Sequence, residues 1–198
     1  MDVHALDIDG AFAFTPPVFK DRRGLFASPF QGAAFAETLG KPLFQVQQVS
    51  HNLSSRGVLR GIHFTATPPG MAKYVYCPYG QLQDYLIDLR VGSPTFGKWI
   101  TTRLGADTAR ALYVPVGVGH AFLSLADDSM AVYVMSEGYV PENEYAMNPL
   151  DPEIGLAFPE DVELVQSDRD LAAPSLAEAL ERGMLADYAL CRELDAKL

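Results

Sequence analysis

Two histidines lie in glycine-containing, apolar segments typical of strands, and each is followed by a second side chain that can handle a proton. His63 ends the run Arg-Gly-Ile-His, upstream of Lys73, and His120 ends the run Pro-Val-Gly-Val-Gly-His, upstream of Tyr133. An imidazole can remove a proton from carbon next to a carbonyl, an amine can stabilise the enolate oxygen, and a phenol can return a proton. Removal from one face and return on the other would invert the carbon.

A single histidine in an apolar strand is more often a hydrogen-bonded core residue than a catalytic one. The neighbours of this pair favour chemistry, because Arg60, Lys73, Asp84 and Tyr133 fall on or near adjacent predicted strands. Spacing alone leaves their convergence open. The other two histidines are expected to be structural or solvated, His4 in a terminus and His51 in a polar run.

Other site classes fit the sequence poorly. A metal site in a barrel would need two histidines close together, but Thr65 stands where a His-x-His pair would continue from His63. We therefore expect no metal. No glycine-rich phosphate loop and no Gly-x-Ser-x-Gly motif occur, and Cys77 is expected to be a buried strand residue.

Length and composition limit the classes of protein to which this chain could belong. The 198 residues, 48% of them hydrophobic, predict a single domain over 1–198, and the net charge of −10 argues against nonspecific nucleic-acid binding. Only two cysteines are present, the start shows no signal-peptide pattern, and no apolar run approaches the length of a membrane span. These features predict a cytoplasmic protein without membrane association.

Short β-rich runs separated by turns predict an all-β sandwich or jelly-roll barrel, with its core at about residues 40–160. The expected strands are residues 45–51, 72–77, 82–89, 98–104, 111–116, 121–125 and 130–136. Short helices are expected at 31–39, 175–182 and 185–194, the last two in a C-terminal helical tail over about 175–198. Ser175 and Glu178 form a predicted capping box.

One predicted strand carries carboxylates on a partly apolar face. Asp84 and Asp88 occupy alternate positions of this strand together with Leu82 and Leu86, so all four side chains are expected on one face. A face buried only for stability would avoid such charges, so these residues either line a polar cavity inside a barrel or belong to an ordinary solvated face. The sequence leaves both interpretations open.

These motifs resemble the dTDP-4-dehydrorhamnose 3,5-epimerase family, including its relatives in antibiotic deoxysugar pathways. The similarity runs from about residue 18 to residue 170 and keeps the family's order of motifs. Its main motifs are Gly57-Val-Leu-Arg60-Gly-Ile-His63-Phe, Lys73, Asp88-Leu-Arg-Val-Gly-Ser-Pro-Thr-Phe-Gly-Lys-Trp99, Pro115-x-Gly-x-Gly-His120, Tyr133, Tyr139-Val-Pro-Glu-Asn-Glu144 and Leu150-Asp-Pro-Glu-Ile-Gly155.

The resemblance implies a metal-free cupin-type jelly roll, a homodimer that exchanges an N-terminal segment, and a dTDP-linked 4-keto-6-deoxy sugar as substrate. It assigns His63 as general base, Asp170 as its orienting carboxylate, Tyr133 as general acid and Lys73 as enolate stabiliser. No cofactor is expected, because the substrate's own carbonyl activates its neighbours. The implied substrate-binding residues are Arg23 (from the partner subunit), Phe26, Gln48, Arg60, His120, Tyr139, which stacks on thymine, Glu144 and Arg169.

The chain departs from the family pattern at several positions. Ser28 replaces a common glutamate and Ser50 a common asparagine, both at implied nucleotide-binding positions. Thr65 and Ala121 resemble the branch that acts in secondary metabolism, whose members include enzymes that invert one carbon. The sequence leaves open whether C3, C5 or both are inverted.

Three functions are compatible with these residues. The expected one is cofactor-independent epimerisation at C3, C5 or both, through an enolate. The alternatives are a keto-sugar 3,4-isomerase and a non-catalytic nucleotide-sugar-binding cupin. A pure binder has no need of His63, Tyr133 and Asp170 together, which favours an enzyme.

Overall fold

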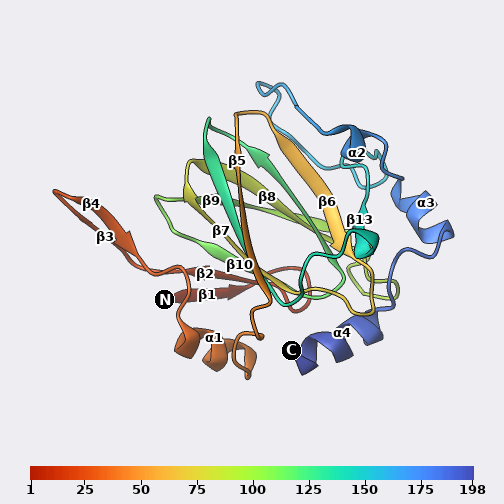
Figure 1. Cartoon of the computed structure of the whole chain (residues 1–198), viewed down its shortest axis with the longest axis horizontal. Helices are drawn as coiled ribbons and strands as arrows, with labels where there is room; N and C mark the ends of the chain where they lie inside the picture. Colours follow the sequence, from red (N-terminus) through yellow and green to blue (C-terminus); the bar gives the residue numbers. More distant parts are fainter.

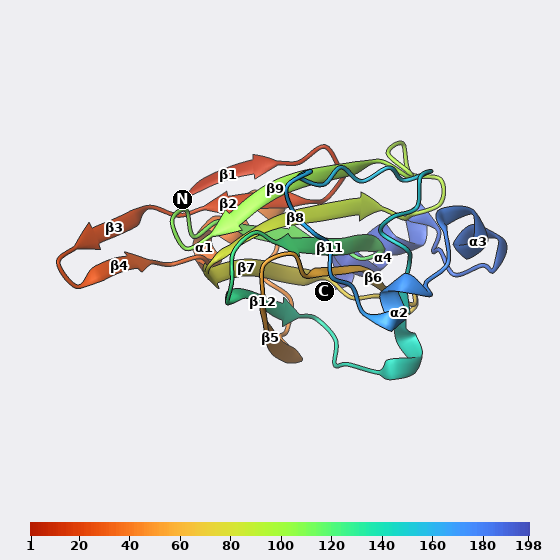
Figure 2. The same cartoon turned by 90° about the horizontal axis from the view of Figure 1, so that it is seen from above.

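The computed structural model describes all residues of the chain and consists mainly of two antiparallel sheets (Figures 1 and 2). The six-stranded sheet has the order β1 (Asp2–Ala5), β2 (Phe12–Thr15), β10 (Ala111–Val114), β7 (Lys73–Tyr79), β12 (Ser129–Met135) and β5 (Gln48–Ser54). The five-stranded sheet has the order β13 (Glu144–Ala146), β6 (Leu59–Thr65), β11 (Val118–Ser124), β8 (Gln81–Asp88) and β9 (Trp99–Gly105).

A separate hairpin and several short helices complete the chain. The hairpin consists of β3 (Val18–Asp21) and β4 (Gly24–Ala27), and it extends away from both sheets, at the left of both views (Figures 1 and 2). The helices are α1 (Gly32–Leu39), α2 (Asp168–Leu171), α3 (Leu176–Glu181), α4 (Tyr188–Lys197) and the short 3-10 helix η1 (Pro141–Asn143). No helix is both long enough and apolar enough to cross a bilayer.

Alternation along β8 shows how the core forms. Leu82 and Leu86 point between the sheets, where they join a cluster with Val75 and Phe122 from other strands. Tyr85 packs on the opposite face of the five-stranded sheet, in a cluster that extends to α3. Successive side chains of a strand face opposite ways, so the five-stranded sheet is covered on both sides.

The same alternation decides between the two interpretations of the β8 carboxylates. Asp84 has the parity of Leu82 and Leu86 and is 1% exposed, between the sheets. Asp88, at the end of the strand, is completely buried. The solvated-face interpretation is therefore wrong, and the interior of the sandwich holds buried charge.

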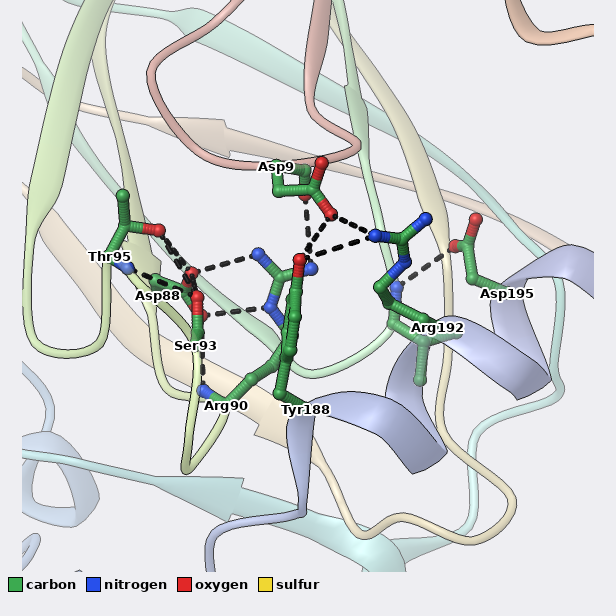
Figure 3. Close-up of polar contacts among 9 residues, drawn as sticks. Asp9, Asp88, Arg90, Ser93, Thr95, Tyr188, Arg192 and Asp195 are labelled. Carbon is green, nitrogen blue, oxygen red and sulfur yellow. Dashed lines mark hydrogen bonds and ion pairs between the residues drawn. The ribbon is translucent and has the colours of Figure 1, made fainter.

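A polar network fastens the C-terminal helix α4 to the sandwich (Figure 3). Arg90, which is 2% exposed, donates to both carboxylate oxygens of Asp88 at 2.8 Å and to the carbonyl oxygen of Asp9. The ring of Tyr188 lies over this guanidinium, 5.1 Å from ring centre to the guanidinium carbon, and its hydroxyl donates to the Asp9 carboxylate at 2.7 Å. Arg192 forms an ion pair with the same carboxylate. The network joins the N-terminal turn, the end of β8 and α4.

The predicted all-β class with short peripheral and C-terminal helices is confirmed. Each predicted strand and helix is present, with ends displaced by up to three residues, and the capping box of Ser175 and Glu178 forms as predicted. Strand β6 was given no predicted range, although the segment that ends at His63 was expected to be typical of a strand. Strands β1 to β4 and β13 were not predicted at all. These five strands are only three or four residues long, so alternation has too few positions to be recognised.

Candidate active site

A pocket of about 240 Å³ opens between the two sheets. The six-stranded sheet and the five-stranded sheet both contribute to its walls, and the loop before η1 adds an aromatic side chain. Its lining residues are Gln48, Ser50, Asn52, Arg60, His63, Lys73, His120, Phe122, Tyr133, Met135, Tyr139 and Glu144. The structure thus brings together most of the site residues expected from the sequence.

A bulge in β6 places Arg60 and His63 on the same face. His63 lies opposite His120 of β11 and Arg60 lies opposite Phe122, so three steps along β6 match two steps along β11. Strict alternation would point Arg60 and His63 to opposite sides of the sheet. Gly61 makes the bulge feasible. Its φ is +117°, and an added Cβ would lie 2.6 Å from the Cβ of Ala121.

His63 and Asp170 form a hydrogen-bonded pair. The Nε2 atom of His63 lies 2.7 Å from Oδ1 of Asp170, whose side chain is 4% exposed. Asp170 sits in the first turn of α2, where its backbone N–H donates to the side chain of Ser167, the N-cap residue. Burial alone would raise the pKa of Asp170, but its contacts with His63 hold the pKa below the ordinary value. A carboxylate there orients the imidazole and stabilises its protonated form.

A second histidine–carboxylate pair lies deeper. The Nε2 atom of His120 is 2.7 Å from Oδ2 of Asp84, and both side chains are almost fully buried. Burial raises the pKa of Asp84, and its contacts with His120 and with Lys73 offset this only in part. The other oxygen of this carboxylate, Oδ1, has no hydrogen-bond partner within the chain. The pair holds the ring of His120 against the ring of Tyr133, with centroids 5.8 Å apart.

Lys73 and Tyr133 face this pocket from neighbouring strands of the six-stranded sheet. Lys73 is 8% exposed, and burial lowers the pKa of its amine, although nearby Glu144 and Asp84 act in the opposite direction. Burial raises the pKa of the Tyr133 phenol. A phenol that stays protonated near neutral pH can act as a proton donor.

Strand β5 supplies a polar wall to the pocket. Gln48, Ser50 and Asn52 share one parity and line the pocket, whereas the intervening residues are exposed. The amide of Gln48 donates to Ser50 at 2.9 Å and accepts a hydrogen bond from the backbone N–H of Tyr139 at 2.8 Å. Gln48 thereby anchors the loop that carries the Tyr139 ring, which is itself exposed.

Basic side chains extend the site toward α2. A neighbouring depression of about 370 Å³ shares Arg60 and His63 with the pocket and adds Arg169 and Asp170. Arg169 donates to the backbone oxygen of Glu144 at 2.7 Å. The carboxylate of Glu144 also accepts a hydrogen bond from Thr65. Two guanidinium groups therefore line this depression next to the pocket, an arrangement suited to phosphate oxygens.

Three expected binding residues lie outside both the pocket and the neighbouring depression within the chain. Arg23 and Phe26 belong to the projecting hairpin, and Ser28 follows it. The side chain of Arg23 is 84% exposed and pairs with Asp21 of the same hairpin, and Phe26 is 65% exposed. One chain does not bring these residues to the site.

Sequence reasoning missed Asn52, which donates a hydrogen bond to the hydroxyl of Tyr133 at 2.8 Å. The predicted strand ended at residue 51, one position too early to include Asn52. The sequence did contain a signal for it: Asn52 lies two residues after Ser50 and four after Gln48, so all three side chains fall on one face of a strand. No three His, Cys, Asp or Glu side chains gather where they could hold a metal ion together.

Comparisons with known proteins agree on one family. The family model for dTDP-4-dehydrorhamnose 3,5-epimerase matches residues 5–178. A dTDP-4-dehydro-6-deoxyglucose 3-epimerase from a Streptomyces species is 46% identical over 191 residues, which cover 96% of this chain and 97% of the relative. A dTDP-4-dehydrorhamnose 3,5-epimerase from Mycolicibacterium smegmatis is 45% identical over 192 residues, covering 97% and 94% respectively.

A solved structure supports the same assignment. ChmJ, a 3'-monoepimerase from Streptomyces bikiniensis crystallised with dTDP-quinovose, has a TM-score of 0.93 and 44% identity, with 98% of each chain covered. The match therefore includes both sheets, the hairpin and the helices that flank them. On its sequence and its fold, the chain belongs to the dTDP-4-dehydrorhamnose 3,5-epimerase family.

Proposed function

We propose that this protein, an isomerase by its family, inverts C3, C5 or both in a dTDP-4-keto-6-deoxyhexose by removing and returning a proton on carbon. One observation carries the proposal. His63 of one sheet, hydrogen-bonded to Asp170 of α2, and the half-buried Tyr133 of the other sheet line a single pocket that also contains the buried Lys73. Base and acid therefore face the pocket from opposite sides, as inversion requires.

His63 removes the proton. With its Nε2–H donated to Asp170, the other ring nitrogen, Nδ1, is free to accept a proton from carbon. The C–H bond breaks, its electrons form a C=C bond, and the carbonyl oxygen becomes an enolate that the amine of Lys73 stabilises. Tyr133 then gives its proton to the opposite face of the carbon while the carbonyl re-forms. Solvent exchange restores both side chains, and no external oxidant or cofactor takes part.

Polar, basic and aromatic side chains in and beside the pocket bind the nucleotide. Arg60 and Arg169 line the depression beside the pocket and suit a diphosphate, because one guanidinium group can donate two parallel hydrogen bonds to phosphate oxygens. Tyr139 presents an exposed ring for stacking on thymine, and Gln48 anchors its loop. Glu144 lines the same wall.

A second copy of the chain completes the site in this proposal. The hairpin carries Arg23 and the exposed side chains Phe19 and Phe26, which a homodimer would cover. Arg23 of the partner subunit would then be the third diphosphate ligand. Ser28, where relatives commonly have glutamate, supplies only a short hydroxyl to that wall.

The direct test is ¹H NMR of dTDP-4-keto-6-deoxyglucose incubated with the protein in deuterated water. Deuterium at C3 and C5 together with inverted product supports a double epimerase, and deuterium at one carbon supports a single epimerase. Absence of exchange at both carbons would refute the proposal. A shifted ketone in the product would support a 3,4-isomerase instead, because it changes the proton connectivity.

Mixing two inactive variants tests the shared site. Arg23→Ala and His63→Asn each damage a different part of it. In a re-equilibrated equal mixture, half of the dimers are mixed and each mixed dimer has one intact site, so roughly a quarter of the wild-type activity should return. If each chain uses its own Arg23, mixing will restore nothing. A mixture of His63→Asn with Asp170→Asn, which lie in the same chain's site, restores no intact site and is the control.

A further inference from the structure

A directional chain of hydrogen bonds runs from Arg60 to Tyr133. The Nε–H of Arg60 donates to Oγ of Ser54 at 3.2 Å, and Oγ of Ser54 donates to Oδ1 of Asn52 at 3.3 Å. The Nδ2 of Asn52 in turn donates to the hydroxyl oxygen of Tyr133 at 2.8 Å. The four residues come from β5, β6 and β12, and Ser54 is 3% exposed.

The donor and acceptor roles run in one direction along this chain. A guanidinium can only donate, so the Ser54 hydroxyl accepts from Arg60, and its own proton is donated to Oδ1 of Asn52. The amide oxygen of Asn52 is thereby occupied, and its NH₂ group is directed at Tyr133. The oxygen of Tyr133 is an acceptor in this contact, so its own proton is left for another partner.

Sheet register explains why Asn52 reaches this position. Strands β5 and β12 are antiparallel, with Tyr133 opposite Ser50 and Ala131 opposite Asn52. Asn52 and Tyr133 are therefore diagonal neighbours on the same face, within reach of long side chains. Both residues line the pocket between the sheets.

We propose that Asn52 is a positioning residue for the acid step: its amide holds the Tyr133 hydroxyl with the proton facing the pocket and then stabilises the phenolate left after that proton is transferred. The proposal rests on the function proposed above for Tyr133. Burial and nearby Asp84 both disfavour a phenolate, whereas the hydrogen bond from Asn52 and the charge of Arg60 favour it. Asn52 is the direct contact among these favourable groups.

The proposal separates two observable events. Removal of the carbon-bound proton depends on His63 and Lys73, and Asn52 is hydrogen-bonded to neither of them, so this step should not require Asn52. Return of a proton on the other face does require it. If the return fails, the enolate takes deuterium back from His63, and the substrate becomes labelled without being inverted. The informative quantity is the ratio of inverted product to labelled, un-inverted substrate.

The test uses Asn52→Asp in deuterated buffer near pH 8, with the NMR assay above. The carboxylate matches the amide in shape but accepts the Tyr133 proton instead of donating to its oxygen, and it opposes a phenolate. We expect the ratio to fall roughly 10- to 150-fold, since hydrogen bonds to charged groups are worth about 1.5–3 kcal/mol. Asn52→Ala, which adds no charge, should lower it about 10-fold. Both variants should exchange the carbon-bound protons for deuterium at a rate within about 3-fold of the wild-type rate.

A pH series distinguishes positioning from a merely structural effect. As pH falls through the pKa of the new carboxyl, the neutral acid can donate to Tyr133 again, and the ratio for Asn52→Asp should recover. The wild type is the reference, because it carries the same titratable and charged groups around this position. They are Arg60 and His63 from β6, Lys73 from β7, His120 from β11, Tyr133 from β12 and Glu144 from β13, which line the pocket with Asn52, and Asp84 from β8, which lies near Tyr133. A matched control is Asn148→Asp, the same substitution in a loop, where the side-chain oxygen accepts from Leu150.

The outcomes are distinct. A wild-type ratio in both Asn52 variants, or a parallel loss of exchange and inversion, would overturn the role of Asn52. In a Tyr133→Phe background the Asn52→Ala change should have no further effect on the ratio, and an undiminished effect would also overturn it. Absence of exchange in the wild type itself would instead refute the proposed function.

Discussion

Replacing Asp170 by asparagine tests the base directly. The side chain is 4% exposed and its Oδ1 lies 2.7 Å from Nε2 of His63, so solvent screens their interaction weakly. Asparagine keeps the shape and an acceptor oxygen but removes the negative charge that stabilises the imidazolium formed on proton removal. Its backbone contact with Ser167 does not depend on the side chain.

The expected magnitude follows from this geometry. Hydrogen bonds to charged groups contribute about 1.5–3 kcal/mol, and each ~1.4 kcal/mol is tenfold in rate, so exchange should slow roughly 10- to 150-fold. The assay is the initial rate of deuterium incorporation at C3 and C5 under saturating substrate. Because the loss precedes the acid step, inversion should slow by the same factor, and the ratio of inversion to exchange should not change.

A matched control lies on the same helical turn. Asp168 is exposed and is also in α2, so Asp168→Asn makes the same chemical change without touching His63. It should exchange at close to the wild-type rate. If Asp170→Asn slowed exchange less than about 3-fold, or if Asp168→Asn slowed it equally, the role of Asp170 as orienting carboxylate would be untenable.

Three other perturbations have defined outcomes. Tyr133→Phe should lower inversion about 10²- to 10⁴-fold in the NMR assay while exchange continues, and equal loss of both would contradict the acid role. Gly61→Ala should lower the free energy of unfolding in urea by at least about 1–3 kcal/mol, because its φ of +117° and the close approach of Ala121 leave no room for a Cβ; a change below about 0.5 kcal/mol would contradict this. Burial acts to raise the pKa of Asp88, but hydrogen bonds from Arg90, Ser93 and Thr95 hold it below its ordinary value. This depressed pKa stabilises the fold above the unfolded value of about 4, and the stabilisation is lost as pH falls through the folded value. The decrease in Tm on acidification should therefore be shallower for Asp88→Asn, and an identical acid decrease would show that this carboxylate does not contribute.

The sequence predicted the strands that contain long alternating or apolar runs, and the motifs predicted most of the pocket. Its limit is visible at β6. Arg60 and His63 differ in parity, so regular alternation would separate them, and only the bulge at Gly61 brings both to one face. A bulge depends on how a strand pairs with its neighbour, which one strand's own sequence does not specify.

Asn52 and the hairpin illustrate two other limits. Asn52 acts across the sheet through the register of β5 with β12, and register depends on two segments about eighty residues apart in the chain. The hairpin strands β3 and β4 are short and mostly exposed on both faces, so they lack the burial pattern by which strands are recognised. Their residues were assigned to the site through family resemblance alone.

The placement of the proposed base and the proposed acid on different sheets gives the hydrophobic core a second role. Face-to-face sheets lie about 10 Å apart, and side chains such as Val75, Leu86 and Phe122 fill the space between them and keep that separation. His63 and Tyr133 are carried on those same two sheets. The packing of the core therefore sets the width of the gap between the two sheets, in which the proposed sugar ring must fit. Under the proposed mechanism, a methyl group gained or lost in this core, away from the pocket, would change that gap without altering His63 or Tyr133.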